Sequence, residues 1–469
     1  MSKPDWVADS IFYQIFPDRF FNGDSNNDPP NIKPWNSSPT NKAFFGGDLI
    51  GIIRKFDYLL DLGVNAIYLN PIFQSSSNHR YNTYDYFKID PKLGDLDDFI
   101  QLLDVAHQNS VHIILDGVFN HCGRGFFAFD DILENSDDSP YKDWFLPKSY
   151  PLDAYSSDTE PNYDAWWQIK SLPKFNTNNP DVRKYLFGIA RYWIELGADG
   201  WRLDVPNEID DLDFWQEFCY EVKSINANAY ILGEIWTPDT KWVGDGLFDG
   251  LMNYPFREIL TNVLTQEYPD ISGLKNDFMR LGTMYPPPVN QFMYQLLGSH
   301  DTERVLTILQ GDIRKLKLAY LLLFSLQGAP SIYYGDEIGL QGGKDPDCRR
   351  TFNWDRDTWN FEIYEYLKNL IQYRKEYLTL RYGKFFVLSN SNSGSTLVLS
   401  RTYGSSIIII PMNFSASSDS IKVSLTSLNI NEDSHFQDIF SKKHIHPVNG
   451  FIEFFLPPFH GTWILVTPS

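Results

Sequence analysis

The 469-residue sequence is poor in cysteine and in positive charge. Its three cysteines, Cys122, Cys219 and Cys348, are odd in number and scattered, so they provide neither a disulfide framework nor a Cys-x-x-Cys metal motif. Reduced thiols of a cytosolic protein are the expected state. The chain carries 40 Lys and Arg against 60 Asp and Glu, a net charge of −20. This acidity argues against nucleic acid and anionic membrane surfaces as partners.

Long apolar runs are also missing. The longest apolar region, LAYLLLFSLQGAPSIYY, breaks at Gly328 and Pro330, short of the ~20 residues that a membrane helix needs. The N-terminus, MSKPDWVADS, has no apolar core of a secretory signal. We therefore predict a cytoplasmic protein with no membrane partner. Aromatic residues, by contrast, make up 16% of the chain, and an excess of Trp and Tyr suits stacking on ligands such as sugars.

Eight short apolar runs alternate with amphipathic helical patterns over the first 370 or so residues. They are IFYQIF, AIYLNPIF, VHIILDGVF, DGWRLDV, AYILGEIW, GLFDGLMNY, YQLLGSH and SIYYGDE. Repeated strand–helix units predict a parallel sheet, and eight of them favour a closed (β/α)₈ TIM barrel over an open doubly wound sheet. A dinucleotide-binding sheet would place Gly-x-Gly-x-x-Gly after the first strand, and IFPDRF is unlike it.

Two regions fall outside the barrel pattern. From Asn120 to about Phe175 the chain is rich in Asp, Ser, Pro and aromatics, and it is too long for a structureless loop. After about residue 380, short β-type runs alternate with Ser, Asn and Gly turns. We predict an α/β protein with its catalytic barrel in residues 1–121 and 176–379. A small inserted domain B would span 122–175, after the third strand, and a C-terminal all-β sandwich 380–469.

Polar side chains gather where the predicted strands end. The third strand ends in Asp116, Asn120 and His121, the fourth carries Arg202 and Asp204, the fifth Glu234, and the seventh His300 and Asp301. Barrel enzymes carry their chemistry at this end. Each residue alone is more easily explained as structural, but their coincidence predicts an active site.

Three carboxylates, two histidines and an arginine, without a phosphate loop, favour glycoside hydrolysis. That reaction needs a carboxylic acid for the leaving oxygen and a second carboxylate as nucleophile or base. Arg202 and Asp204 share one face of their strand, so the arginine is expected to keep the aspartate ionised. Glu234, beside Trp236 at the next strand's end, would keep its proton through burial or like-charge repulsion.

Sequence blocks carry a family resemblance over nearly the whole chain. DGVFNH, GWRLDVPNE, GEIW and LLGSHDTER, in this order, resemble the four signature regions of the α-amylase family, glycoside hydrolase family 13. GAPSIYYGDEIG resembles a further block on the eighth strand. LPKFN and DPDCRRTFNW are similar to the cyclomaltodextrinase, neopullulanase and maltogenic amylase branch. The resemblance implies a retaining hydrolase acting on maltooligosaccharides, cyclodextrins, pullulan or branched glucans.

The resemblance also implies residue roles. The nucleophile, the acid/base and a hydroxyl-binding acid would be Asp204, Glu234 and Asp301. Further substrate contacts would come from Tyr81, His121, Arg202, Trp236, His300, Asp345 and Arg349. Of these, Tyr81 would stack on the sugar at the cleavage position, Trp236 would line the leaving-group side, and Asp345 with Arg349 would form the next position on the non-reducing side. For Tyr81 and Trp236 an ordinary core position is the alternative.

A structural calcium site is a further expectation, with no organic cofactor. NGDSNND and the later FGGD offer the hard oxygen ligands that calcium prefers. The ligand set implied by the resemblance is Asn22, Asp24, Asn27, Asp28, the carbonyl of Gly46, and Asp48. A turn rich in Asn and Asp without metal is the alternative.

The chain departs from the branch in several places. The branch usually begins with an N-terminal β-domain that forms dimers, whereas the first barrel strand here starts near residue 11. We therefore expect a more open cleft and a monomer, or a dimer not made through such a domain. Thr237 stands where His is frequent, Pro206 where Ala is common and Asn82 where Asp is common. The open cleft, with Thr237 and Pro206 flanking the leaving-group positions, predicts α-1,6 cleavage, or debranching, alongside or above α-1,4 cleavage.

Two other functions stay open. A transglycosylase or sugar isomerase would use the same scaffold with a different acceptor. A non-catalytic, amylase-like carbohydrate-binding protein would lack the catalytic acids or carry a membrane anchor, and the sequence shows neither change.

Overall fold

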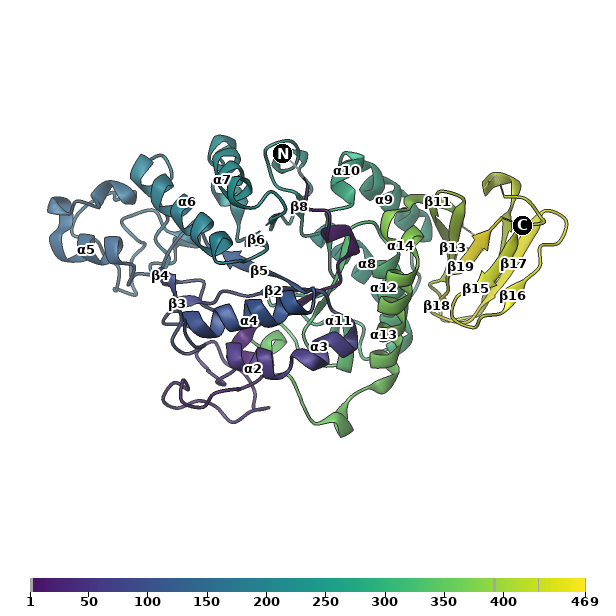
Figure 1. Ribbon diagram of the computed structural model, residues 1–469, viewed down its shortest axis with the longest axis horizontal. Helices are drawn as coiled ribbons and strands as arrows, with labels where there is room; N and C mark the ends of the chain where they lie inside the picture. The colour runs from purple at the N-terminus through teal and green to yellow at the C-terminus, as the bar shows by residue number, and fades with distance from the viewer. Residues whose placement is uncertain (1–2, 391–393, 429, 469) are drawn as a thin grey trace.

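The computed structural model describes residues 3–390, 394–428 and 430–468, and it centres on a parallel β-barrel (Figure 1). The sheet has eight strands in the order β8-β7-β6-β5-β2-β1-β10-β9. Their bounds are β1 Phe12–Ile15, β2 Ala66–Leu69, β5 His112–Gly117, β6 Gly200–Leu203, β7 Tyr230–Gly233, β8 Gly250–Leu251, β9 Tyr294–Gln295 and β10 Ala329–Tyr333. Seven lie within the predicted apolar runs, and β10 begins two residues before the run SIYYGDE.

The two ends of this sheet meet and close the barrel. Met252, directly after β8, forms a parallel bridge with Tyr294 of β9. The backbone N–H of Asn253 donates to the carbonyl of Tyr294 at 2.9 Å. The prediction of a (β/α)₈ barrel is therefore confirmed. The strands are buried on both faces, as parallel strands covered by helices should be.

Helices follow the strands and cover the barrel from outside. They are α1 Pro17–Phe20, α2 Leu49–Arg54, α3 Phe56–Leu62, α4 Leu96–Gln108, α6 Pro180–Glu195, α7 Leu212–Ile225, α8 Tyr254–Thr265, α9 Ile271–Met284, α10 Pro287–Asn290, α11 Val305–Ile308, α12 Ile313–Ser325, α13 Phe361–Glu376 and α14 Leu378–Tyr382. Local sequence explains their starts: Asp95 and Asp98 form a capping box on α4, and Asn179 caps α6 just before Pro180.

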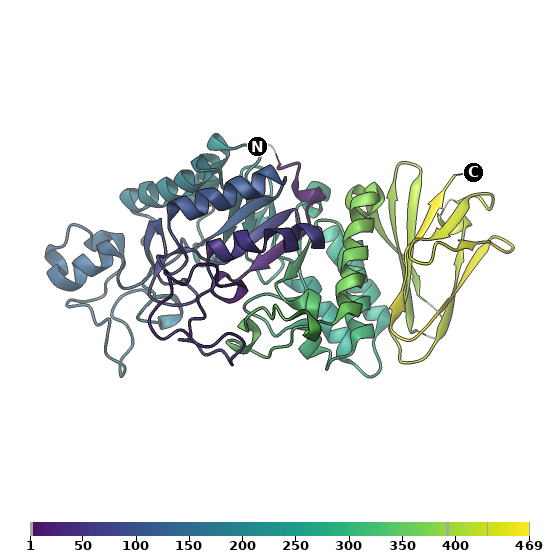
Figure 2. The same cartoon turned by 60° about the horizontal axis from the view of Figure 1, so that its bottom comes forward.

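The segment between β5 and α6 projects from one end of the molecule (Figure 2). It contains α5 Phe127–Asn135 and the 3₁₀ turns η2 Ser136–Asp138, η3 Lys142–Trp144 and η4 Trp166–Gln168. The isolated bridge His121–Lys174 ties its two ends together. A neighbouring hairpin, β3 Phe73–Ser75 with β4 Thr83–Ile89, supports it through the bond from Gly123 N–H to the Thr83 carbonyl at 2.8 Å. Nothing tests the predicted domain boundaries, which stay predictions.

The C-terminal strands form an antiparallel domain at the opposite end (Figure 2). One sheet holds β11 Lys384–Asn390, β12 Thr396–Tyr403, β13 Ser406–Asn413, β15 His435–Asp438, β16 His444–Ile445, β18 His460–Gly461 and β19 Ile464–Thr467. A second layer pairs β14 Asp419–Ser424 with β17 Phe451–Leu456. An apolar core, including Val398, Ile409 and Ile452, lies between them. The predicted C-terminal β-sandwich is therefore confirmed. Among the described helices, none is long and apolar enough to cross a bilayer.

Candidate active site

The C-terminal ends of β5, β6 and β7 bring four charged side chains together. Strand register places Asp116 opposite Arg202. Asp204 follows β6 and its N–H donates to the carbonyl of Gly117 at 3.0 Å, while Glu234 follows β7 and its N–H donates to the carbonyl of Leu203 at 3.1 Å. All four side chains are buried. The parallel register therefore fixes which polar residues share one edge of the barrel.

The Arg202 guanidinium is the centre of this group. Its Nη1 lies 2.8 Å from Asp116 Oδ1 and 3.1 Å from Asp204 Oδ1. Its Nη2 lies 2.8 Å from Glu234 Oε1. Burying an unpaired charge is costly, and here three carboxyl groups compensate one cation. Sequence reasoning anticipated the pair with Asp204 but missed that Asp116 and Glu234 contact the same guanidinium. The matched positions of Asp116 and Arg202 on adjacent strands were the available signal.

Electrostatics favour a retained proton within this cluster. Burial raises the pKa of Glu234 to about 7, although the Arg202 charge opposes the shift. Burial also raises the pKa of Asp204, and the neighbouring Glu234 and Asp116 charges add to that effect, so the lowering by the Arg202 charge does not outweigh them, contrary to the expectation that this arginine keeps the aspartate ionised. Three carboxyl groups facing one guanidinium cannot all ionise cheaply. The cluster is therefore built to hold a proton near neutral pH, which is what a general acid requires.

The loop after β6 orients Glu234 through a strained residue. Val205 adopts φ +37°, a left-handed conformation that is rare for a β-branched residue. In that conformation its N–H donates to Glu234 Oε2 at 3.1 Å. Trp236 Nε1 donates to Glu234 Oε1 at 3.2 Å, and the indole stacks on Tyr254 with ring centroids 3.7 Å apart. Trp236 is 46% exposed, so it is not a core residue.

A second group of predicted residues adjoins the first through Tyr81. The Tyr81 hydroxyl donates to Asp116 Oδ2 at 2.7 Å and lies 2.6 Å from His300 Nε2. The Gln14 amide donates to His300 Nδ1 at 2.9 Å, so Nε2 carries the ring proton and donates it to the Tyr81 hydroxyl, while Asp301 Oδ2 lies 3.1 Å from Nε2. Burial lowers the pKa of His300 to about 3, so the imidazole is neutral at physiological pH.

Arg349 joins Asp301 to Asp345. Its Nη2 donates to Asp301 Oδ1 at 3.1 Å, and its Nη1 lies 3.2 Å from Asp345 Oδ1. Although burial acts in the opposite direction, the His300 and Arg349 neighbours lower the pKa of Asp301 below its usual range. A cavity of about 120 Å³ beside them is lined by Asp345, Arg349 and His79, among others.

His121 lies at the entrance of the inserted segment. Its ring stacks on Trp166, with centroids 5.1 Å apart, and Nδ1 lies 3.2 Å from the Asn120 amide. Its Nε2 has no hydrogen-bond partner among the described residues. Burial lowers the pKa of His121 to about 3, so this imidazole is also neutral. The ten predicted catalytic and substrate-binding residues thus lie at or around the C-terminal end of the barrel.

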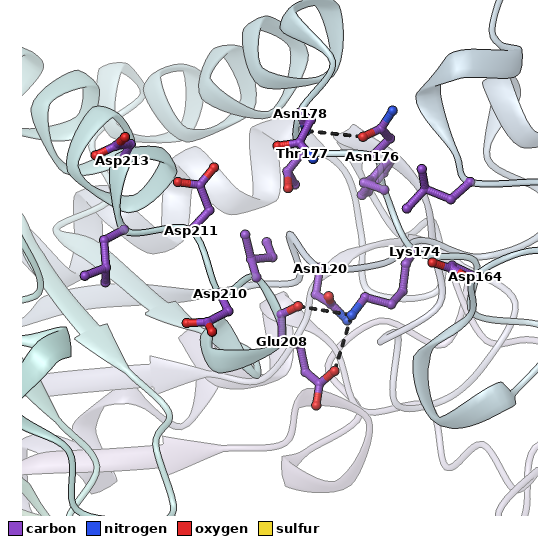
Figure 3. A pocket seen from close by; sticks show the side chains of 14 residues that line it. Asn120, Asp164, Lys174, Asn176, Thr177, Asn178, Glu208, Asp210, Asp211 and Asp213 are labelled. Carbon is purple, nitrogen blue, oxygen red and sulfur yellow. Dashed lines mark hydrogen bonds and ion pairs between the residues drawn. The ribbon is translucent and has the colours of Figure 1, made fainter.

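A pocket of about 590 Å³ lies beside the site, between the inserted segment and the loop after β6. Figure 3 shows Lys174 reaching Glu208, with Nζ 3.0 Å from the Glu208 carbonyl and 3.3 Å from Oε2. Glu208 is four residues beyond Asp204, so this contact ties the inserted segment to the loop that carries the predicted nucleophile. The sequence blocks LPKFN and DVPNE contain both residues, but nothing in them marked the contact.

The three departures from the branch pattern occupy different environments. The Asn82 amide accepts from Ser75 Oγ at 2.8 Å and belongs to the β3–β4 hairpin. Pro206 opens the turn η5 Pro206–Glu208, and its carbonyl accepts from Trp215 Nε1 at 3.2 Å. Thr237 is exposed beyond Trp236. Pro206 and Thr237 therefore flank the predicted catalytic acids, whereas Asn82 supports a hairpin.

The expected calcium ligands form one cluster, in which one oxygen atom has no partner among the described residues and others already accept hydrogen bonds. Asn22 Nδ2 donates to Asp28 Oδ1 at 2.7 Å, and both side chains lie so close to Gly46 that a Cβ there would clash with them. Asn27 Oδ1 is buried with no partner in the described part of the chain. Asp48, however, accepts backbone N–H groups and caps α2. No three Asp, Glu, His or Cys side chains converge on a metal position in the described residues.

A (β/α)₈ barrel with paired carboxyl groups around one arginine, at the end where barrel enzymes react, defines a glycoside hydrolase arrangement. Residues 14–383 match the family described as alpha amylase, catalytic domain. The chain therefore belongs to the α-amylase family.

Relatives and solved structures support the same assignment. The chain is 45% identical over 412 residues to a cyclomaltodextrinase of Geobacillus thermopakistaniensis, covering 87% of this chain and 69% of that protein. The cyclic α-maltosyl-(1→6)-maltose hydrolase of Arthrobacter globiformis has a TM-score of 0.90 and 37% identity, covering 99% of this chain and 100% of that chain. A debranching enzyme of Nostoc punctiforme has a TM-score of 0.88 and 39% identity, covering 100% and 99%.

Proposed function

We propose that this protein is a retaining α-glucan hydrolase of the neopullulanase type, cleaving α-1,4 and/or α-1,6 glucosidic bonds. The observation that carries the proposal is the Arg202 guanidinium, which contacts both Asp204 and Glu234 at the C-terminal end of the barrel. Two carboxyl groups facing one bond are the machinery of glycoside hydrolysis.

In this mechanism Glu234 and Asp204 act in two steps. Glu234 donates its proton to the glycosidic oxygen while Asp204 attacks the anomeric carbon, so the leaving sugar departs and a covalent glycosyl-enzyme forms. The Glu234 carboxylate then takes a proton from water, whose oxygen displaces Asp204 and regenerates the starting state. A Glu234 pKa of about 7 suits a group that must give and recover a proton.

The surrounding residues bind and orient the sugar. Asp301 is an anionic acceptor for hydroxyl groups, held by His300 and Arg349. Tyr81 offers a ring face, and neutral His121 and His300 supply hydrogen bonds. Arg202 orients Asp204, Asp345 with Arg349 forms the next position, and Trp236 lines the leaving-group side. Glucose hydroxyls are the chemistry that such a set of neutral and anionic partners recognises.

Cleavage of α-1,6 bonds alongside α-1,4 bonds is part of the proposal. Pro206 and Thr237 flank the catalytic acids in the sequence, and Thr237 is exposed beyond Trp236. One structural relative, the Arthrobacter hydrolase, is named for a cyclic substrate that contains (1→6) linkages, and the Nostoc protein is named a debranching enzyme.

Product analysis tests the function. Cyclodextrin, pullulan and a branched maltooligosaccharide are digested and the products separated by chromatography, with NMR of the first anomer released. An α-anomer supports the retaining mechanism, and a β-anomer would refute it. Panose as the sole pullulan product, with branches untouched, would refute debranching while leaving α-1,4 hydrolysis intact.

A structural calcium ion completes the proposal. Asn22, Asp24, Asn27, Asp28, Gly46 and Asp48 would hold it, and the ion would fix this loop against the start of α2. The buried, unpartnered Asn27 Oδ1 supports the assignment. A cytoplasmic location and a monomer, or a dimer formed elsewhere on the barrel, stay predictions.

A further inference from the structure

Three aromatic rings stack from the active site out through the inserted segment. The His121 and Trp166 rings are 12° from parallel with centroids 5.1 Å apart. The Trp166 and Trp167 rings are 13° from parallel with centroids 4.4 Å apart. His121 is fully buried, whereas Trp167 is 74% exposed. The stack therefore connects a residue of the proposed sugar site with a flat apolar face on the surface.

Trp167 is held in this exposed position against two unfavourable effects. Its backbone lies in the left-handed region, at φ 49° and ψ 30°, and Gln168 follows at φ 60°. Large non-glycine residues rarely adopt this conformation, and such strain persists mainly at functional sites. Exposing an indole also forgoes the gain from burying a large apolar ring. Both effects oppose stability, which points to a use for the exposed face.

The ring beneath Trp167 carries an unused hydrogen-bond donor. Trp166 Nε1 is buried and has no partner within the described part of the chain. Buried polar groups are nearly always paired, so an orphaned donor calls for an explanation. The exposed outer face of Trp167 matches a ligand with an apolar face, such as a pyranose ring.

We propose that Trp167, supported by Trp166, binds an additional glucose unit of the α-glucan, outside the position at which the bond is cleaved. This inference rests on the proposed function, because the glucan is its ligand. The C–H face of the pyranose stacks on the outer face of the Trp167 indole, whose inner face rests on Trp166. The position favours longer or branched glucans over short ones, because only they extend from the cleavage position across two further rings.

Binding measurements along a chain-length series test the proposal. The Glu234→Gln background prevents hydrolysis, and calorimetry records the affinity for maltose through maltoheptaose. Trp167→Asn removes the ring while tolerating the left-handed backbone. We expect it to weaken maltoheptaose binding by about threefold to tenfold and to leave maltose unchanged. Trp167→Phe keeps an aromatic face and should restore most of the loss. Tyr268→Ala, at an 84% exposed aromatic between α8 and α9, is the control.

The outcomes distinguish a failure of the Trp167 position from a failure of the proposed hydrolase function. Equal losses for maltose and maltoheptaose, or no loss for either, would overturn the Trp167 position. An unchanged profile in Tyr268→Ala with the expected profile in Trp167→Asn supports it. If the Glu234→Gln protein binds no maltooligosaccharide and the parent releases no product, the proposed function itself fails. Normal hydrolysis with a length profile insensitive to Trp167 rejects only the additional position.

Discussion

Replacing Glu234 by glutamine gives a prediction whose size follows from the structure. Burial raises the pKa of this carboxyl to about 7 from an ordinary value of 4.5. At about 1.4 kcal/mol per pKa unit, the proton on Glu234 stabilises the folded state by about 3 kcal/mol relative to its ionised form. This contribution is fully present below pH 4.5 and is lost as the pH rises through 7. Glutamine does not titrate, so it removes this pH dependence.

Glu234→Gln should therefore gain stability relative to the parent as the pH rises, while it loses activity. Its free energy of unfolding, by urea denaturation, should gain about 3 kcal/mol over the parent between pH 4.5 and pH 8. Its turnover should fall by about 10²–10⁴-fold, because proton donation is lost while shape is kept. In the parent, kcat/KM should decline as the pH rises above about 7. Glu258→Gln, at an exposed position on α8, is the matched control.

The reasoning fails on any of three results. More than about 10% residual turnover would remove Glu234 from the acid/base role. A parent profile that stays flat to pH 9 would contradict the elevated pKa. If the difference in unfolding free energy between Glu234→Gln and the parent does not change with pH, burial does not raise the pKa of Glu234. The predicted stability difference and the predicted pH profile of activity would then both fail.

Three further predictions probe the rest of the site. Arg202→Leu should destabilise the fold by about 3–5 kcal/mol, because it leaves buried carboxyl groups without their cation; a variant that unfolds at the parental urea midpoint would oppose this. Trp236→Ala should change the ratio of α-1,6 to α-1,4 products more than it changes their total amount. An unaltered ratio would show that Trp236 does not line the leaving-group side. Removing calcium with a chelator should lower the melting temperature if the ion holds the loop around Asp28. An unchanged melting curve, with no metal bound to the protein, would refute the calcium site.

Much of the site was predictable because strand ends are local features of the sequence. DGWRLDV has the length and composition of a buried strand, and its charges could be tolerated only where a partner or ligand meets them. Once eight such runs imply a closed parallel barrel, their carboxyl ends must share one rim. That argument alone brings Asp204, Glu234 and His300 together.

Other features depended on how distant segments meet. Apolar residues from Leu49 to Leu60 recur at helical spacing, yet the structure breaks this stretch at Lys55 into α2 and α3. Lys174 and Glu208 are distant in sequence, and their contact arises from the way the inserted segment folds back onto the loop after β6. No local pattern encodes such a meeting point.

The amino-acid sequence by itself determined the barrel, the C-terminal sandwich and the identity of the acids at the strand ends, since apolar periodicity and strand polarity are properties of short segments. Only the tertiary structure decided that one guanidinium serves three carboxyl groups and that Trp167 stands exposed on a strained turn. Those outcomes depend on interatomic distances of a few ångströms between segments far apart in the chain, where burial and charge set each group's pKa.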